Sequence, residues 1–155
     1  MNLIGIDLAW QSEKNTSAAA VGQLDGNVLS IHDLREDLDS VESIVEFVAG
    51  YPDVEGIAID APLIINNITG QRSCEKDFSR VYGARKASCH TSNLGLYPDA
   101  PSVDLGSRLV RQGYAHLGAS DDLRWQVECY PHPAIIEIFG LKERLLLHGH
   151  RPFAK

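Results

Sequence analysis

LIGIDLAW (residues 3–10) and IAIDAPL (residues 57–63) share a pattern that determines the fold expected for this chain. In each stretch an Ile-x-Ile run is followed directly by an aspartate, Asp7 in the first and Asp60 in the second. Short apolar runs of this kind predict buried strands, and Pro62 ends the second one. If the two strands pair in parallel, both carboxylates emerge at the same edge of the sheet.

The residues between these two stretches predict a hairpin. SAAAVGQL (17–24) and NVLSIHDL (27–34) have the composition of strands. Asp25 and Gly26 join them and supply the positive φ angles that a tight turn requires. The chain therefore begins with three sequential strands that we expect to be antiparallel.

A helix is expected next, over residues 41–49 (VESIVEFVA), because its apolar side chains recur at helical spacing. Asp39 and Glu42 have the spacing of a capping pair at its start. The pattern beyond Pro62 predicts helices over 72–84, 102–118 and 133–140, a loop over 85–101, a strand over 124–130 and a further helix within 141–150. This order predicts an α/β fold with a mixed five-stranded sheet, three antiparallel strands first and parallel strands after them, flanked by helices.

The composition, 44% hydrophobic and 23% charged over 155 residues, predicts one globular domain spanning residues 1–155. No apolar run approaches the about 20 residues that cross a bilayer, and the N-terminus lacks a signal-peptide pattern. Three widely spaced cysteines argue against a disulfide framework, so we expect a cytoplasmic protein without membrane association. A net charge of -7 argues against a large basic surface that coats nucleic acid, so phosphate binding would depend on a local basic patch or on metal ions.

Asp7 and Asp60 are the main candidates for chemistry. Two close carboxylates repel, so such a pair shares a proton or holds a cation, and oxygen ligands favour Mg²⁺ or Mn²⁺. The alternative is that each aspartate caps the turn after its strand. Glu128, in VECYPHP (127–133), is a third acid in an apolar frame, or else an exposed glutamate on an edge strand. His132 in the same stretch is a candidate general acid or phosphate ligand, or else a structural histidine in a rigid turn.

Basic residues after Pro62 are candidates for substrate binding. Arg72, Lys76 and Arg80 stand at four-residue steps, so a helix presents them as one basic stripe that would bind phosphates over the sheet edge. A solvated helix face with ion pairs explains the same spacing. The only aromatic residues interleaved with them are Phe78 and Tyr82, which gives little support to stacking of single-stranded bases.

The order of elements and the aspartate on the first strand resemble the ribonuclease H fold. GIDLAW, AIDAPL, RSCEKDFSR and ECYPHPA together resemble the domain-of-unknown-function family 429, whose members are predicted nucleases of that fold, over residues 3–139. The resemblance implies metal-dependent hydrolysis of phosphodiester bonds in nucleic acid, with Asp7 bridging two Mg²⁺ or Mn²⁺ ions and Asp60 and Glu128 as flanking ligands. Two ions ~4 Å apart activate the attacking water and stabilise the leaving oxygen in such enzymes. The sequence departs from the fold's pattern in having no recognisable acid in a C-terminal helix.

Two other functions are open. GIDLAWQSEKNTSAAAV (residues 5–21) also resembles the first phosphate loop of actin-like ATPases and sugar kinases. Those proteins need a duplicated domain and a second glycine-rich loop, and AIDAPL stands where those glycines belong. The non-enzymatic alternative is a catalytically inactive ribonuclease H-like module that serves in binding or assembly. The negative net charge and the missing C-terminal acid favour that module, whereas the repeated aspartate favours catalysis.

Overall fold

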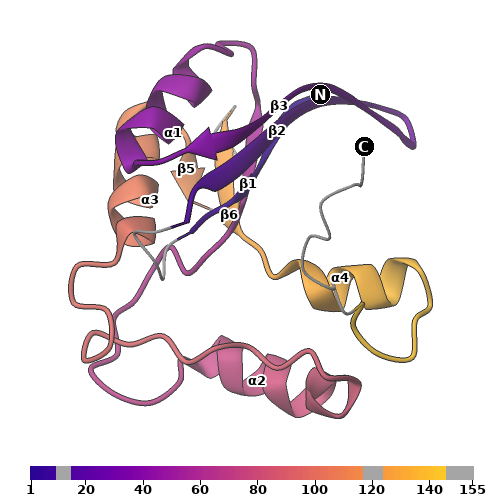
Figure 1. Cartoon of the computed structure of the whole chain (residues 1–155), viewed down its shortest axis with the longest axis vertical. Helices are drawn as coiled ribbons and strands as arrows, with labels where there is room; N and C mark the ends of the chain where they lie inside the picture. The colour runs from indigo at the N-terminus through magenta and orange to yellow at the C-terminus, as the bar shows by residue number, and fades with distance from the viewer. Residues whose placement is uncertain (10–14, 117–123, 146–155) are drawn as a thin grey trace, which may run out of the picture.

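The computed structural model describes residues 1–9, 15–116 and 124–145 (Figure 1). The described strands are β1 (Asn2–Asp7), β2 (Ser17–Asp25), β3 (Val28–Leu38), β4 (Gly56–Asp60), β5 (Ala115–His116) and β6 (Trp125–Glu128). The described helices are α1 (Val41–Ala49), α2 (Ser73–Tyr82), the short 3-10 helix η1 (Gly83–Arg85), α3 (Pro101–Arg111) and α4 (Pro131–Ile138). None of these helices combines the length and the apolar character that crossing a membrane requires.

The strands form one mixed sheet in the order β3-β2-β1-β4-β6-β5. The pairs β1–β2 and β2–β3 are antiparallel, and the pairs β1–β4, β4–β6 and β5–β6 are parallel. This confirms the predicted sheet of antiparallel strands followed by parallel ones, although the described sheet has six strands rather than five. The additional strand, β5, falls where the sequence predicted the end of a helix over 102–118. α3 stops at Arg111 because Gly113 takes a φ of 94°, with which a right-handed helix cannot continue.

Three further boundaries differ from those predicted. α1 is capped by Ser40 and Ser43, whose hydroxyl oxygens each accept the other's backbone N–H at 3.1 Å, and not by the pair one residue earlier. α4 begins at Pro131 rather than Pro133, because Pro131 already suits the first helical position, where a missing N–H costs nothing. Residues 141–145 are not helical, and the remainder of the helix expected within 141–150 lies outside the described residues.

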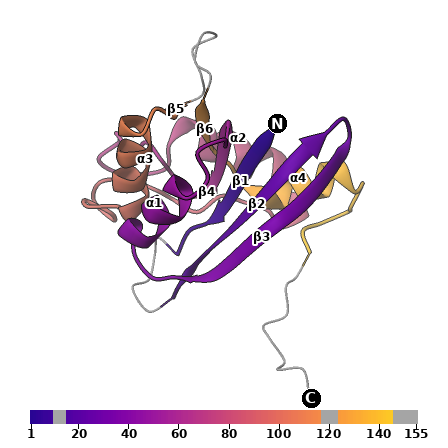
Figure 2. The same cartoon turned by 90° about the horizontal axis from the view of Figure 1, so that it is seen from above.

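Side chains along the central strands alternate between the two faces of the sheet, with large apolar residues on one face and the aspartates on the other. Ile4, Ile6 and Ile59 are buried in the core, together with side chains of α1 and α3. The residues that alternate with them, which include Asp7 and Asp60, face the other side of the sheet. Figure 2 shows α1 and α3 grouped on one side of the sheet and α4 on the other. The two aspartates therefore belong to the face that α4 covers.

Candidate active site

Asp7 and Asp60 are the last residues of β1 and β4 and lie side by side. In the parallel pairing of these strands Asp7 is the register partner of Asp60. Register partners on neighbouring strands direct their side chains to the same face, so both carboxylates point toward α4. They line a hollow of about 650 Å³ there, together with His132. The parallel pairing that the sequence predicted is confirmed, and it brings both aspartates to one site.

Asp60 is the more perturbed of the two aspartates. Its burial, with smaller contributions from the negative charges of Asp7 and Glu128, raises its pKa from 3.8 to about 6. All three effects disfavour the ionised carboxylate. A proton or a cation bound at this position offsets them, so the geometry suits either occupant.

We expect Asp60→Asn to stabilise the metal-free protein above pH 6. The pKa of Asp60 in the folded protein, about 6, lies above the 3.8 of an ordinary aspartate, so the fold is favoured with the carboxyl protonated. This stabilisation is complete below pH 4 and is lost as the pH rises through 6. The substitution should therefore change the free energy of unfolding little at pH 4. At pH 8 it should raise that free energy by on the order of 2 kcal/mol, after an allowance for solvent screening.

Thermal or urea unfolding in EDTA across this pH range measures the effect. Asp53→Asn, at an exposed position in the turn before β4, is the matched control and should show no such pH-dependent gain. An Asp60→Asn protein that is no more stable than the wild type at pH 8 contradicts the prediction.

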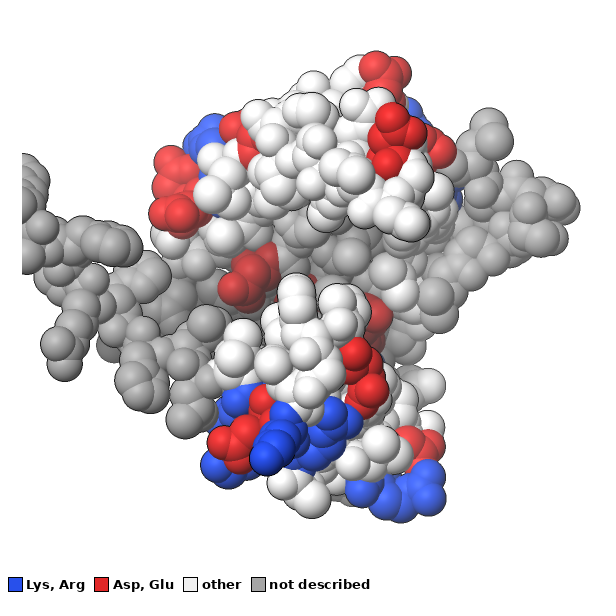
Figure 3. Space-filling view, turned by 90° about the vertical axis from the view of Figure 1, so that its right-hand side faces the viewer, with Lys and Arg blue, Asp and Glu red and all other residues white. Residues whose placement is uncertain are grey.

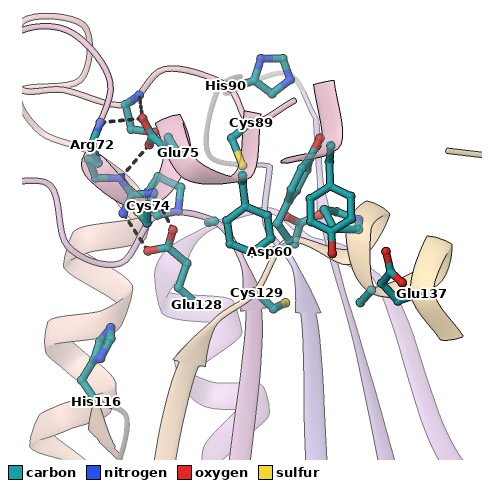
Figure 4. A pocket seen from close by; sticks show the side chains of 18 residues that line it. Asp60, Arg72, Cys74, Glu75, Cys89, His90, His116, Glu128, Cys129 and Glu137 are labelled. Carbon is teal, nitrogen blue, oxygen red and sulfur yellow. Dashed lines mark hydrogen bonds and ion pairs between the residues drawn. The ribbon is translucent and has the colours of Figure 1, made fainter. Parts of the chain in front are cut away.

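Glu128, the third acid predicted for the site, ends β6 but turns toward α2 (Figure 4). Its carboxylate accepts two hydrogen bonds from the guanidinium of Arg72, from Nη1 at 2.8 Å and from Nη2 at 2.5 Å, and a third from the backbone N–H of Leu63 at 3.1 Å. Its register partner in β4 is Ile59, not Asp60. Among the residues that the structure describes, no group of three or more His, Cys, Asp and Glu side chains is arranged to hold a metal ion. The structure thus pairs Asp7 with Asp60 and leaves Glu128 in an ion pair.

Arg72 is the centre of an ion-pair network that sequence reasoning missed. Its Nε donates to Glu75 at 2.7 Å, and its Nη1 also donates to the carbonyl of Ile64 at 3.0 Å. The side chain of Glu75 is only 3% exposed and also accepts the backbone N–H of Ser92 at 3.1 Å. Burial alone would raise the pKa of Glu75, but the hydrogen bonds from Arg72 and Ser92 outweigh it and hold that pKa below its usual value. The network ties the start of α2 to the end of β6.

Arg72 therefore does not share an exposed basic stripe with Lys76 and Arg80. The side chain of Arg72 is 11% exposed and that of Arg80 is 78% exposed, and Arg80 forms an ion pair with Asp77 on the same helix. Lys76 is also exposed. In Figure 3 the Lys and Arg side chains gather at the bottom of the molecule, where Figure 1 shows α2, while acidic side chains lie inside the hollow above them.

His132 lies in the first turn of α4, edge-on to Tyr130, with ring centroids 5.5 Å apart. Its burial, with smaller contributions from Arg144 and His90, lowers its pKa, so the imidazole is neutral at physiological pH. It lines the same hollow as both aspartates, which Arg72, Lys76 and Arg80 do not.

The donor set of this site fits one hard divalent cation. Mg²⁺ is commonly held by one or two carboxylates, and waters and substrate phosphates complete its shell. Asp7 and Asp60 supply two carboxylates in register, and a divalent charge would offset the burial and the repulsion that together raise the pKa of Asp60. Glu128 can join them only by giving up its bonds to Arg72.

Comparison with known proteins identifies one match. The family model described as "Protein of unknown function (DUF429)" matches residues 5–150, a range that includes both aspartates and the Arg72 network. No curated protein and no solved structure matches the chain.

Proposed function

Because the chain belongs to the DUF429 family, whose description names no function, we propose a function from its carboxylate pair: the protein is a metal-dependent nuclease of ribonuclease H-like fold. The observation that carries the proposal is the parallel register of Asp7 with Asp60 at the ends of two central strands. The strand order, three antiparallel strands followed by parallel ones, supports the ribonuclease H-like assignment. The proposed compartment is the cytoplasm, since all three cysteines are free thiols.

In this proposal Asp7 and Asp60 hold Mg²⁺ or Mn²⁺ in the hollow beneath α4. The ion, when bound, neutralises phosphate charge and lowers the pKa of a bound water. The neutral imidazole of His132 donates a hydrogen bond to a phosphate oxygen or to the leaving oxygen. Lys76 and Arg80, exposed on α2, attract the nucleic-acid backbone from outside the site. The ribonuclease H resemblance implies two metal ions, but two carboxylates support one ion more readily. Glu128, the third acid, is hydrogen-bonded to Arg72.

Hydrolysis of a panel of single-stranded, duplex, hybrid and branched nucleic acids tests the proposal. The protein is expected to cleave at least one member in Mg²⁺ or Mn²⁺ at pH 8, where Asp60 is ionised, and to cleave none in EDTA. Divalent ions are also expected to raise the melting temperature, because a ligand that binds only the folded state stabilises it. If no divalent ion raises the melting temperature and no member of the panel is cleaved, the proposal is wrong.

A binding module without catalysis is the second candidate. The ion pair between Arg72 and Glu128 favours this candidate, because it leaves the carboxylate pair without a third acidic ligand. In that case the panel would contain strands that the protein binds in the presence of a divalent ion but leaves intact.

A further inference from the structure

A cavity of about 590 Å³ lies between α2 and α4 and meets the carboxylate pair at Asp60 (Figure 4). Its volume is in the range of small-molecule sites in proteins. Asp60 and Cys129 line both this cavity and the hollow that contains Asp7 and His132. A group bound in the cavity is therefore next to the position where the proposed function puts a phosphodiester.

Aromatic rings line this cavity from both of its helical walls. Phe78 and Tyr82 come from α2, with ring centroids 5.8 Å apart and ring planes inclined by only 25°. Tyr130 comes from the opposite wall, immediately before α4. Phe78 is 39% exposed, which leaves ring surface open to a ligand at the cavity. The sequence revealed the first two rings, but the third is brought to them only by the fold.

Apart from Asp60, which faces the carboxylate pair, the Asp, Glu and Arg side chains that line the cavity are already paired. Arg72 binds both Glu75 and Glu128, so neither its charge nor theirs is free. Glu137 is paired with Arg85, at 2.5 Å. These pairs leave little reason for a phosphate to enter the cavity, and they favour an uncharged ligand.

Three thiols line the cavity, those of Cys74, Cys89 and Cys129. Burial, reinforced by the negative charge of Glu75, raises the pKa of Cys89 to about 11, so this thiol is uncharged at neutral pH. A neutral thiol behaves as a small apolar group. Together with Pro133 and Ala134, these thiols give the cavity a mostly apolar surface between its aromatic walls.

We propose that this cavity binds an unpaired nucleobase of the strand whose backbone lies at Asp60, an inference that rests on the proposed function. A nucleobase is flat, uncharged and apolar on its faces, and it stacks on aromatic side chains once it leaves a duplex. The ring of Phe78 is the stacking surface. The preferred substrate is accordingly a single strand, a loop or a flipped-out nucleotide, and not an intact duplex.

Binding of a short DNA strand with methylphosphonate linkages and one fluorescent 2-aminopurine tests this proposal. The linkages carry no charge and resist hydrolysis, so in EDTA the probe reports base binding without any contribution from metal or phosphate. The wild type is expected to bind the probe saturably and to change its fluorescence. Phe78→Ala is expected to weaken binding by about 5- to 150-fold, the loss of one stacked base. Phe78→Tyr, which keeps a ring, is expected to bind nearly as well as the wild type.

Val81→Ala is the matched control, because Val81 is 57% exposed on the same helix and does not line the cavity. Circular dichroism establishes that each variant is folded. If the wild type does not bind the probe, or if Phe78→Ala and Val81→Ala bind it equally well, the nucleobase site is wrong, whatever the hydrolysis panel shows. Binding that depends on the Phe78 ring supports the site, and it does so even if hydrolysis fails and the proposed nuclease function falls.

Discussion

Asp7→Asn is expected to lower the rate of metal-dependent hydrolysis by about 10³-fold. The substitution removes one of the two carboxylates that face the hollow, and losing one well-placed electrostatic partner in an active site costs about 10²–10³-fold or more. Asparagine has the shape of aspartate, and Asp7 is exposed, so the fold should be unaffected. Initial rates on the best substrate of the panel, at saturating Mg²⁺ or Mn²⁺, measure the effect.

Two further measurements separate lost chemistry from lost folding. The gain in melting temperature on adding a divalent ion should shrink in Asp7→Asn, whereas its melting temperature in EDTA should equal or exceed that of the wild type, because Asp60 loses a repulsive neighbour. Asp53→Asn, which changes an exposed aspartate outside the site, should match the wild type in its melting temperature in EDTA and in its gain on adding a divalent ion. Full hydrolysis by Asp7→Asn would show that the carboxylate pair is not the catalytic site.

Arg72→Ala is expected to lower the free energy of unfolding by about 3–5 kcal/mol at pH 7. The loss is large because Glu75 and Glu128 then face each other without a cation, and the side chain of Glu75 is almost fully buried. The pKa of Glu75 is held below its usual value in the folded protein, so the ion pair stabilises the fold at neutral pH and loses that effect in acid. The difference between variant and wild type should therefore narrow below about pH 4.

Urea unfolding at pH 7 and at a pH well below 4 measures both parts of this prediction. Arg80→Ala is the matched control, since Arg80 is on the same helix but its ion pair with Asp77 is exposed and worth about 0.2–1 kcal/mol. An Arg72→Ala protein that loses no more stability than Arg80→Ala would contradict the central role of the network.

The parts of the fold and of the site that could be predicted are those that a repeated local sequence pattern indicates. The two Ile-x-Ile-Asp runs were sufficient to predict the parallel pairing of β1 with β4, and hence the meeting of Asp7 and Asp60. Strand β5 was not predicted because two residues are too few to show a periodic pattern. The turn at Gly113 that precedes it has no apolar pattern either.

The partners of Glu128 were beyond sequence reasoning for a different reason. Arg72 and Glu128 are 56 positions apart, and only the path of the chain after β4 and the end of β6 brings them together. The basic spacing of Arg72, Lys76 and Arg80 was real, but spacing does not tell which side chain turns inward. Tyr130 joined the aromatic rings of α2 in the same way, through the fold and not through proximity in the sequence.

The ion network at Arg72 also governs how far one wall of the cavity can move. It fastens the start of α2 to β6 and so restrains outward movement of the helix that carries Phe78. Local opening of this kind requires less free energy than unfolding the sheet, so amide hydrogens of α2 should exchange with solvent before those of β1 and β4. The ion pairs that stabilise the fold at Arg72 therefore also hold the helical wall of the cavity in place.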